Sequence, residues 1–119
     1  MVAIDPAHLV GTGGAIGAIL RHLVSQRVDV DAFPLGTITV NVVGTFVLAL
    51  ATFAGGGPDL LLFVGTGACG SFTTFSTFSF ETVRLWETGE RLRASVNAVG
   101  NLLGAALAIG LGWAVAALL

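Results

Sequence analysis

The chain has 119 residues, of which 55% are hydrophobic and only 10% are charged, with a formal net charge of −2. Soluble domains carry about 25% charged residues, so this composition excludes an ordinary water-soluble domain and indicates an all-α membrane protein. A helix needs about 20 residues to cross a bilayer. The length therefore predicts a single transmembrane domain, residues 1–119, with four transmembrane helices and short connectors.

The first two predicted helices cover about residues 8–25 and 35–54. The segment QRVDVDAFP separates them, and its proline resets the chain before the second helix. Acidic Asp5 precedes the first apolar run, at the place where a secretory signal peptide carries basic residues. We therefore expect the first helix to be retained as a membrane span.

The third and fourth predicted helices cover about residues 60–86 and 94–118, joined by the charged connector ETGERLR. The third contains GTGACG followed by a run of serines and threonines, whose hydroxyls bond the backbone in non-helical conformations. Residues 70–74 lie near the middle of this span, so we expect helix 3 to be broken near the membrane midplane. Broken membrane helices are a recurrent way to build ion sites.

Glycines recur on three of the predicted helices at spacings that give one face small residues. Small residues let membrane helices approach closely, so we expect tight packing within the chain and against a second copy. The pairs are Gly13 with Gly17, Gly36 with Gly44, and Gly100 with Gly104.

Polar residues inside the predicted spans need a partner or a function, because an unsatisfied polar group in a membrane is costly. Arg21 could reach out to the membrane surface or place a cation at the mouth of an anion pathway. Asn41 could link two helices or offer its two N–H donors to an ion. Asn97 and Asn101 lie one turn apart on one helix face. Three amides and many hydroxyls form a donor-rich lining, which suits an anion.

Phe75 and Phe78 are three residues apart and share a helix face, offset from the hydroxyls of Ser76 and Thr77. Aromatic residues in membrane helices usually serve as apolar filling. Their ring edges nevertheless carry the positive part of the quadrupole. Rings presented edge-on could hold a small anion weakly enough to release it, as conduction requires.

Four segments, one from each predicted helix, resemble the CrcB/Fluc family of fluoride channels. They stand in the family's order and at compatible spacing, and TTFSTF is the most specific part of the match. On helix 4, where many relatives have a tyrosine and serines, this chain has Asn97 and Asn101. The segments are GGAIGAILR (13–21), FPLGTITVNVVGTF (33–46), GACGSFTTFSTFSFE (67–81) and NAVGNLLGA (97–105).

The resemblance implies a fluoride-selective channel in the plasma membrane that lets cytoplasmic fluoride leave passively. It also implies an antiparallel dimer with two pores along the subunit interface. Asn41 would be the pore amide, and Phe75 and Phe78 would be the rings that line the fluoride path. The remaining positions expected along the polar route are Ser76, Thr77, Glu81, Arg21 at the vestibule, Asn97 and Asn101.

The resemblance also explains the expected break in helix 3. In the family, backbone carbonyls at this point coordinate a structural sodium ion at the dimer interface, and the matching positions are Gly70 and Thr73. Carbonyl oxygens suit a hard cation. We expect the glycine at position 70 to permit the required backbone geometry.

The cations are distributed unevenly between the two sides of the membrane. Four predicted spans place both termini and the helix 2–3 turn on one side, which holds no lysine or arginine, while Arg27, Arg84, Arg91 and Arg93 lie on the other. The positive-inside rule then places both termini outside. We therefore expect either a homodimer or a heterodimer with an oppositely oriented paralogue. The alternative is that Arg84 is buried and acids in the same loops reduce the bias.

Other classes of function fit less well. A small four-helix multidrug transporter needs a carboxylate embedded in the membrane, and the first predicted helix has none beyond Asp5 at its entrance. A non-transporting membrane subunit would leave the TTFSTF hydroxyls and Asn41 unexplained. An enzyme is not expected, because no nucleophile, base and orienting group form a recognisable set.

Overall fold

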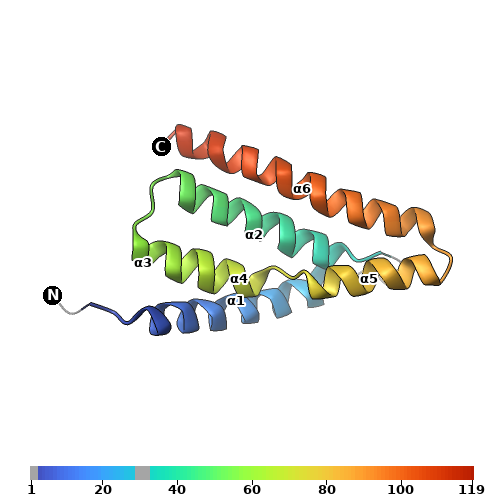
Figure 1. Ribbon diagram of the computed structural model, residues 1–119, viewed down its shortest axis with the longest axis horizontal. Helices are drawn as coiled ribbons and strands as arrows, with labels where there is room; N and C mark the ends of the chain where they lie inside the picture. Colours follow the sequence, from blue (N-terminus) through green and yellow to red (C-terminus); the bar gives the residue numbers. More distant parts are fainter. Residues whose placement is uncertain (1–2, 29–32) are drawn as a thin grey trace.

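The computed structural model describes residues 3–28 and 33–119, and most of them are helical. Four helical rods follow one another, and the third is divided into several pieces (Figure 1). The rods are α1 (Pro6–Val28), α2 (Leu35–Phe53), a bent rod made of α3 (Pro58–Leu60), a π-helix (Leu61–Cys69), α4 (Gly70–Phe72) and α5 (Ser76–Glu87), and finally α6 (Arg91–Ala117).

Within the described ranges, three rods are long and apolar enough to cross a membrane: Leu35–Phe53, Pro58–Glu87 and Arg91–Ala117. The first rod, α1, has 23 residues, which at 1.5 Å per residue span roughly 35 Å. It is less apolar because it carries two arginines and two histidines. The all-helical architecture is confirmed, and the crossing of α1 stays a prediction.

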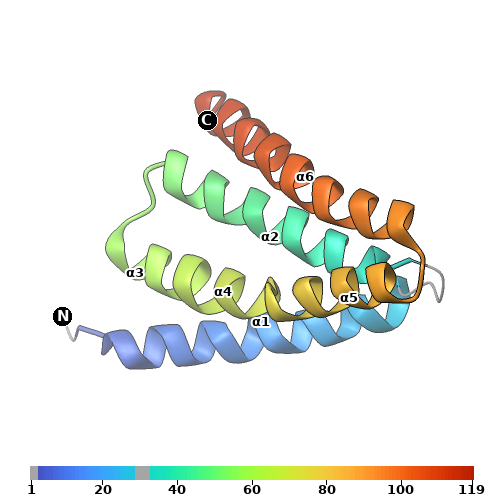
Figure 2. The same ribbon diagram turned by 45° about the vertical axis from the view of Figure 1, so that its right-hand side comes forward.

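The rods lie side by side, with α2 between α6 and the first half of the bent rod (Figures 1 and 2). The main helix pairs are α1 with the π-helix, α2 with α6, and α5 with α6. Both termini and the α2–α3 turn lie at one end of the molecule, and the α5–α6 connection lies at the other. A chain that crosses the membrane four times is expected to have both termini on the same side, as in this arrangement.

Glycines bring α1 and the π-helix into direct backbone contact. A Cβ atom added at Gly13 would collide with the Phe63 carbonyl, and one at Gly17 would collide with the Ala68 carbonyl. On the other side of the molecule, Gly104 lies against Val42 of α2. The expected tight packing within the chain is therefore present. Gly100 is an exception, because its nearest neighbour would be an ordinary contact at 3.8 Å.

The bent rod departs from the expected broken helix in two respects. The break falls at residues 73–75, where Thr73 is extended (φ −85°, ψ 163°), whereas Gly70 is an ordinary helical residue (φ −61°, ψ −32°). The expectation that Gly70 supplies special backbone geometry is therefore wrong. The nine-residue π-helix before the break was not expected, and such segments are rare and often functional.

Few side chains are fully enclosed within the single chain. The buried apolar residues are small or medium in size, and Val40 and Asn97 are the largest side chains with less than 2% exposure among the described residues. Many large apolar side chains face outward along every rod. Such a surface suits contact with lipid or with a second membrane protein rather than with water.

Candidate functional site

The break in the third rod is held by one side chain of α2. Asn41 donates from Nδ2 to the Thr74 carbonyl at 3.0 Å, and its Oδ1 accepts from the Thr74 N–H at 2.8 Å. In an unbroken helix that N–H would donate to the carbonyl of Gly70, four residues back. The Asn41 amide thus replaces the missing helical hydrogen bond and satisfies the peptide groups that the break frees.

Hydrogen bonds continue from Asn41 through two further amides. Asn41 Nδ2 also donates to Asn101 Oδ1 at 3.0 Å, and Asn101 Nδ2 donates to Asn97 Oδ1 at 3.0 Å. Asn97 Nδ2 then donates to the Thr82 hydroxyl of α5 at 2.9 Å. We call Asn41, Asn101, Asn97 and Thr82 the amide relay. It joins α2, α6 and α5 through two buried residues, Asn97 and Asn101, and two half-buried ones, Asn41 and Thr82.

Arg21 lies beside the break and not at the end of its helix. Its Nη1 donates to the Thr73 carbonyl at 3.4 Å, and α1 continues for seven further residues to Val28. A second link between α1 and the bent rod is the Ser71 hydroxyl, which donates to the Gly14 carbonyl at 2.7 Å. The guanidinium therefore faces inward at this point of the fold.

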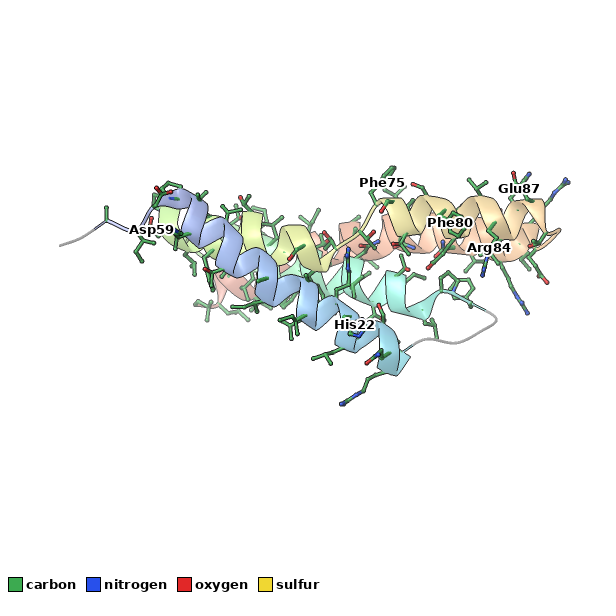
Figure 3. All side chains as sticks on the ribbon, turned by 90° about the horizontal axis from the view of Figure 1, so that it is seen from below. His22, Asp59, Phe75, Phe80, Arg84 and Glu87 are labelled. Carbon is green, nitrogen blue, oxygen red and sulfur yellow. The ribbon has the colours of Figure 1, made fainter. Side chains whose placement is uncertain are left out.

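Phe75 and Phe78 form the aromatic part of the site. Their ring centroids are 5.9 Å apart and the ring planes are tilted by 52°, an orientation between stacked and edge-to-face. Phe75 is 79% exposed within the single chain, and Figure 3 shows it at the break, projecting away from the bundle. The pair is held in place from the backbone side, while its outer side is open.

A groove of about 390 Å³ runs along the face of the chain where the break lies. Of the residues predicted for ion binding, Asn41, Asn101, Phe75 and Phe78 line it, together with the two predicted sodium ligands Gly70 and Thr73. The other lining residues are Gly44, Thr45, Leu48, Gly65, Cys69, Thr74, Ala98, Leu102 and Ala105.

The remaining predicted residues lie outside this groove. Ser76 and Thr77 are exposed in the first turn of α5, and Asn97 is 0% exposed inside the relay. The Thr37 hydroxyl donates one hydrogen bond shared by the two carboxylate oxygens of Glu81, at 2.9 Å from Oε2 and 3.1 Å from Oε1. Arg21 reaches the Thr73 carbonyl, as described above. The ion-binding role of each of these residues stays a prediction.

Three polar residues of the site were not assigned a role from the sequence. Thr45 lines the groove one turn after Asn41, whose carbonyl accepts its hydroxyl at 2.6 Å. Thr74 supplies the peptide that Asn41 holds, and Thr82 ends the amide relay. The spacing of Thr45 from Asn41 was a usable signal. For Thr82 there was none, because its partner lies on another helix.

Comparisons with known proteins identify the family of this chain. Residues 8–113 match the family model described as CrcB-like protein, Camphor Resistance (CrcB). The chain is 58% identical to the fluoride-specific ion channel FluC 2 of Haloarcula marismortui, over 97% of both chains. It is 51% identical to FluC 1 of Halobacterium salinarum over 91% of both chains, and 41% identical to FluC of Methanocaldococcus jannaschii over 87% of this chain and 88% of that relative.

Proposed function

This chain belongs to the CrcB family of fluoride-specific ion channels, and we propose from that membership that it lets fluoride leave the cell passively and so reduces fluoride toxicity. Its family places it in the plasma membrane as a multi-pass protein and makes it a channel, not an enzyme. The apolar helices described above fit that location.

The observation that carries the proposal is the chemistry of the groove. Its polar lining consists of amides, hydroxyls and backbone groups, and none of the described lining residues is charged. Donors and ring edges attract a small anion, while a fixed positive charge would hold it too tightly for conduction. The Asn41 N–H groups and the rings of Phe75 and Phe78 are the proposed contacts for fluoride inside the groove.

The groove is open along one side, and a second antiparallel subunit is the proposed cover. The high exposure of Phe75 and the small buried core of the single chain support a partner on this face. Two subunits related by a twofold axis would present the same face to each other, and each would supply a groove. The interface would then contain two ion paths.

A structural sodium ion at that interface is the second part of the proposal. Thr74 directs its N–H to Asn41 and not to the Gly70 carbonyl, while Thr73 is extended, and both Gly70 and Thr73 line the groove. Carbonyl oxygens are the ligand type that a hard cation prefers. Two carbonyls from one chain are a partial set, so the partner's equivalent pair would complete it.

Polar groups beyond the groove provide a proposed route to the aqueous ends. Thr77 and Thr74 are linked through their side chains, because the Thr74 hydroxyl donates to Thr77 Oγ1 at 3.1 Å. Ser76, Glu81 and the Asn97–Asn101 face would continue this route. Arg21 would attract anions at the vestibule, although its contact with Thr73 places it close to the proposed cation ligands.

Fluoride efflux from liposomes that contain only the purified chain tests the function. An ion-selective electrode records fluoride, and chloride efflux is the matched control. Fluoride flux that greatly exceeds chloride flux would support both the channel and a working homodimer. If the chain alone is silent, co-reconstitution with an oppositely oriented paralogue tests the heterodimer. Silence in both experiments would favour a non-transporting subunit.

A further inference from the structure

The amide relay is part of a longer series of hydrogen bonds in which every donor points the same way. The series begins at the Arg21 guanidinium, passes through the peptide between Thr73 and Thr74, crosses the relay, and ends at the Phe78 carbonyl. It contacts all four rods. Its six donor–acceptor distances are Arg21 Nη1 to Thr73 O 3.4 Å, Thr74 N to Asn41 Oδ1 2.8 Å, Asn41 Nδ2 to Asn101 Oδ1 3.0 Å, Asn101 Nδ2 to Asn97 Oδ1 3.0 Å, Asn97 Nδ2 to Thr82 Oγ1 2.9 Å, and Thr82 Oγ1 to Phe78 O 2.7 Å.

The direction of this series is fixed at both ends by groups that cannot exchange roles. The backbone of Thr74 offers both its N–H and its C=O to Asn41, so the Asn41 amide fits in one orientation only. At the other end the Phe78 carbonyl can only accept, so the Thr82 hydroxyl must donate to it. The side-chain amides of Asn101 and Asn97 lie between these two ends. Each of them can therefore adopt only one orientation.

Hydrogen bonds aligned in one direction polarise one another and strengthen the series. A cation at the donor end adds to this effect, and charge-assisted hydrogen bonds are the stronger ones. The series also joins two backbone positions that carry the aromatic pair. Thr74 directly precedes Phe75, and the terminal carbonyl belongs to Phe78 itself. Its geometry therefore bears on the placement of both rings.

We propose that Asn97, Asn101 and Thr82 are positioning residues for the ion path. They hold the Asn41 amide in position through Asn101, and through Asn41 they hold the backbone of Thr74, directly before Phe75. Asn97 is 0% exposed and does not line the groove, so it acts through Asn41. The effect on conduction rests on the proposed channel function, whereas the coupling along the series does not.

The first experiment reads the coupling directly by NMR of the intact protein in detergent micelles or nanodiscs. The chain contains three asparagines, and all three belong to the relay, so selective ¹⁵N labelling of asparagine side chains gives three amide signals. Thr82→Val removes the hydroxyl at the far end with little change of shape. The expected result is a shift of the Asn101 and Asn41 signals as well as that of Asn97. A shift confined to Asn97 would overturn the proposal.

Thr52→Val is the matched control. Thr52 also donates its hydroxyl to the carbonyl four residues back, Leu48 at 2.8 Å, but it is exposed at the other end of α2. This variant should leave all three amide signals in place. If Thr82→Val fails to assemble, Thr82→Ala removes the same hydroxyl with less bulk and answers the same question.

Fluoride efflux provides the second readout. Thr82→Val leaves Asn97 Nδ2 without its acceptor, and the loss of this one part-buried hydrogen bond should lower the flux about tenfold. Thr82→Ser, which keeps the hydroxyl, should restore it, and Thr52→Val should match the wild type. Equal flux in Thr82→Val and Thr52→Val would overturn the positioning role. Wild-type protein that stays silent both alone and with an oppositely oriented paralogue would contradict the channel function, while the amide signals would still decide the coupling.

Discussion

Asn41 serves the fold and the proposed ion path with the same amide. Each of its N–H groups already has an acceptor, the Thr74 carbonyl or Asn101 Oδ1. Fluoride at this position would therefore have to compete with those oxygens for a donor. Weak, exchangeable binding of this kind is what conduction requires. The two interpretations of Asn41 from the sequence, as a helix link and as a pore amide, are thus compatible.

The variant Asn41→Asp tests both interpretations. An ionised aspartate can accept the Thr74 N–H, but it has no donor for the Thr74 carbonyl or for Asn101. It would also place a negative charge on an anion path. We expect fluoride efflux to be abolished and the protein to lose about 1–3 kcal/mol of stability, measured as a lower midpoint of thermal unfolding in detergent. Undiminished efflux would remove Asn41 from the pore.

Phe75 differs from Asn41 because it has a proposed function in the ion path but few contacts that stabilise the fold. Because its side chain is 79% exposed in the single chain, Phe75→Ile should leave the folding of the subunit intact. We expect it to reduce fluoride efflux at least about tenfold, since an aliphatic side chain has no positive ring edge. Phe80→Ile is the control, because Phe80 is 67% exposed and lies outside the groove. Wild-type efflux from Phe75→Ile would contradict the ring-edge mechanism.

At the scale of the helices, a close contact between α1 and the bent rod lies just before the break. Gly17 lies against the Ala68 backbone and near Ser71, just before the extended residue Thr73. Gly17→Ala would push a methyl group into the Ala68 carbonyl, which cannot rotate away. We expect a loss of about 1–3 kcal/mol from overpacking, seen as a lower thermal midpoint and as reduced fluoride efflux.

Gly11→Ala is the control for this prediction. Gly11 lies on the same helix, and a Cβ atom there would meet nothing within 4 Å. Alanine is also a better helix former than glycine. Gly11→Ala should therefore be neutral or slightly stabilising. If both variants behaved alike, the close contact at Gly17 would not be a determinant of the fold.

How far the sequence predicts each element depends on whether its cause is local. The four rods follow from local hydropathy and breakers, and the hydroxyls after GTGACG correctly indicated a break within a few residues. The π-helix was not predictable, because its wider turn accompanies backbone contact with α1, a tertiary effect. The relay is similar. Asn97 and Asn101 could be placed on one face, but their alignment with Asn41 depends on the rotation of α6 against α2.

At the scale of the whole molecule, the positively charged side chains near the helix ends lie at one end of the bundle. Both termini and the α2–α3 turn lie at the end without lysine or arginine, whereas Arg84, Arg91 and Arg93 lie at or near the α5–α6 connection (Figure 1). Arg84 is exposed in the chain, and Figure 3 shows its side chain directed away from the bundle. The alternative in which a buried Arg84 reduces the charge bias therefore loses support from the fold.

This asymmetry predicts that the chain inserts mainly with both termini outside, because arginines near helix ends stay in the cytoplasm. C-terminal fusions in a bacterial host test it: alkaline phosphatase, active only outside, should give a strong signal, and green fluorescent protein, which is fluorescent only inside, should stay dark. The double variant Arg91→Gln with Arg93→Gln is the control and should shift the signal toward green fluorescence. An antiparallel homodimer needs both orientations of one chain. Equal signals from the two wild-type fusions would therefore support the homodimer and contradict the heterodimer, whereas a one-sided signal would mean that the opposite subunit comes from a second gene.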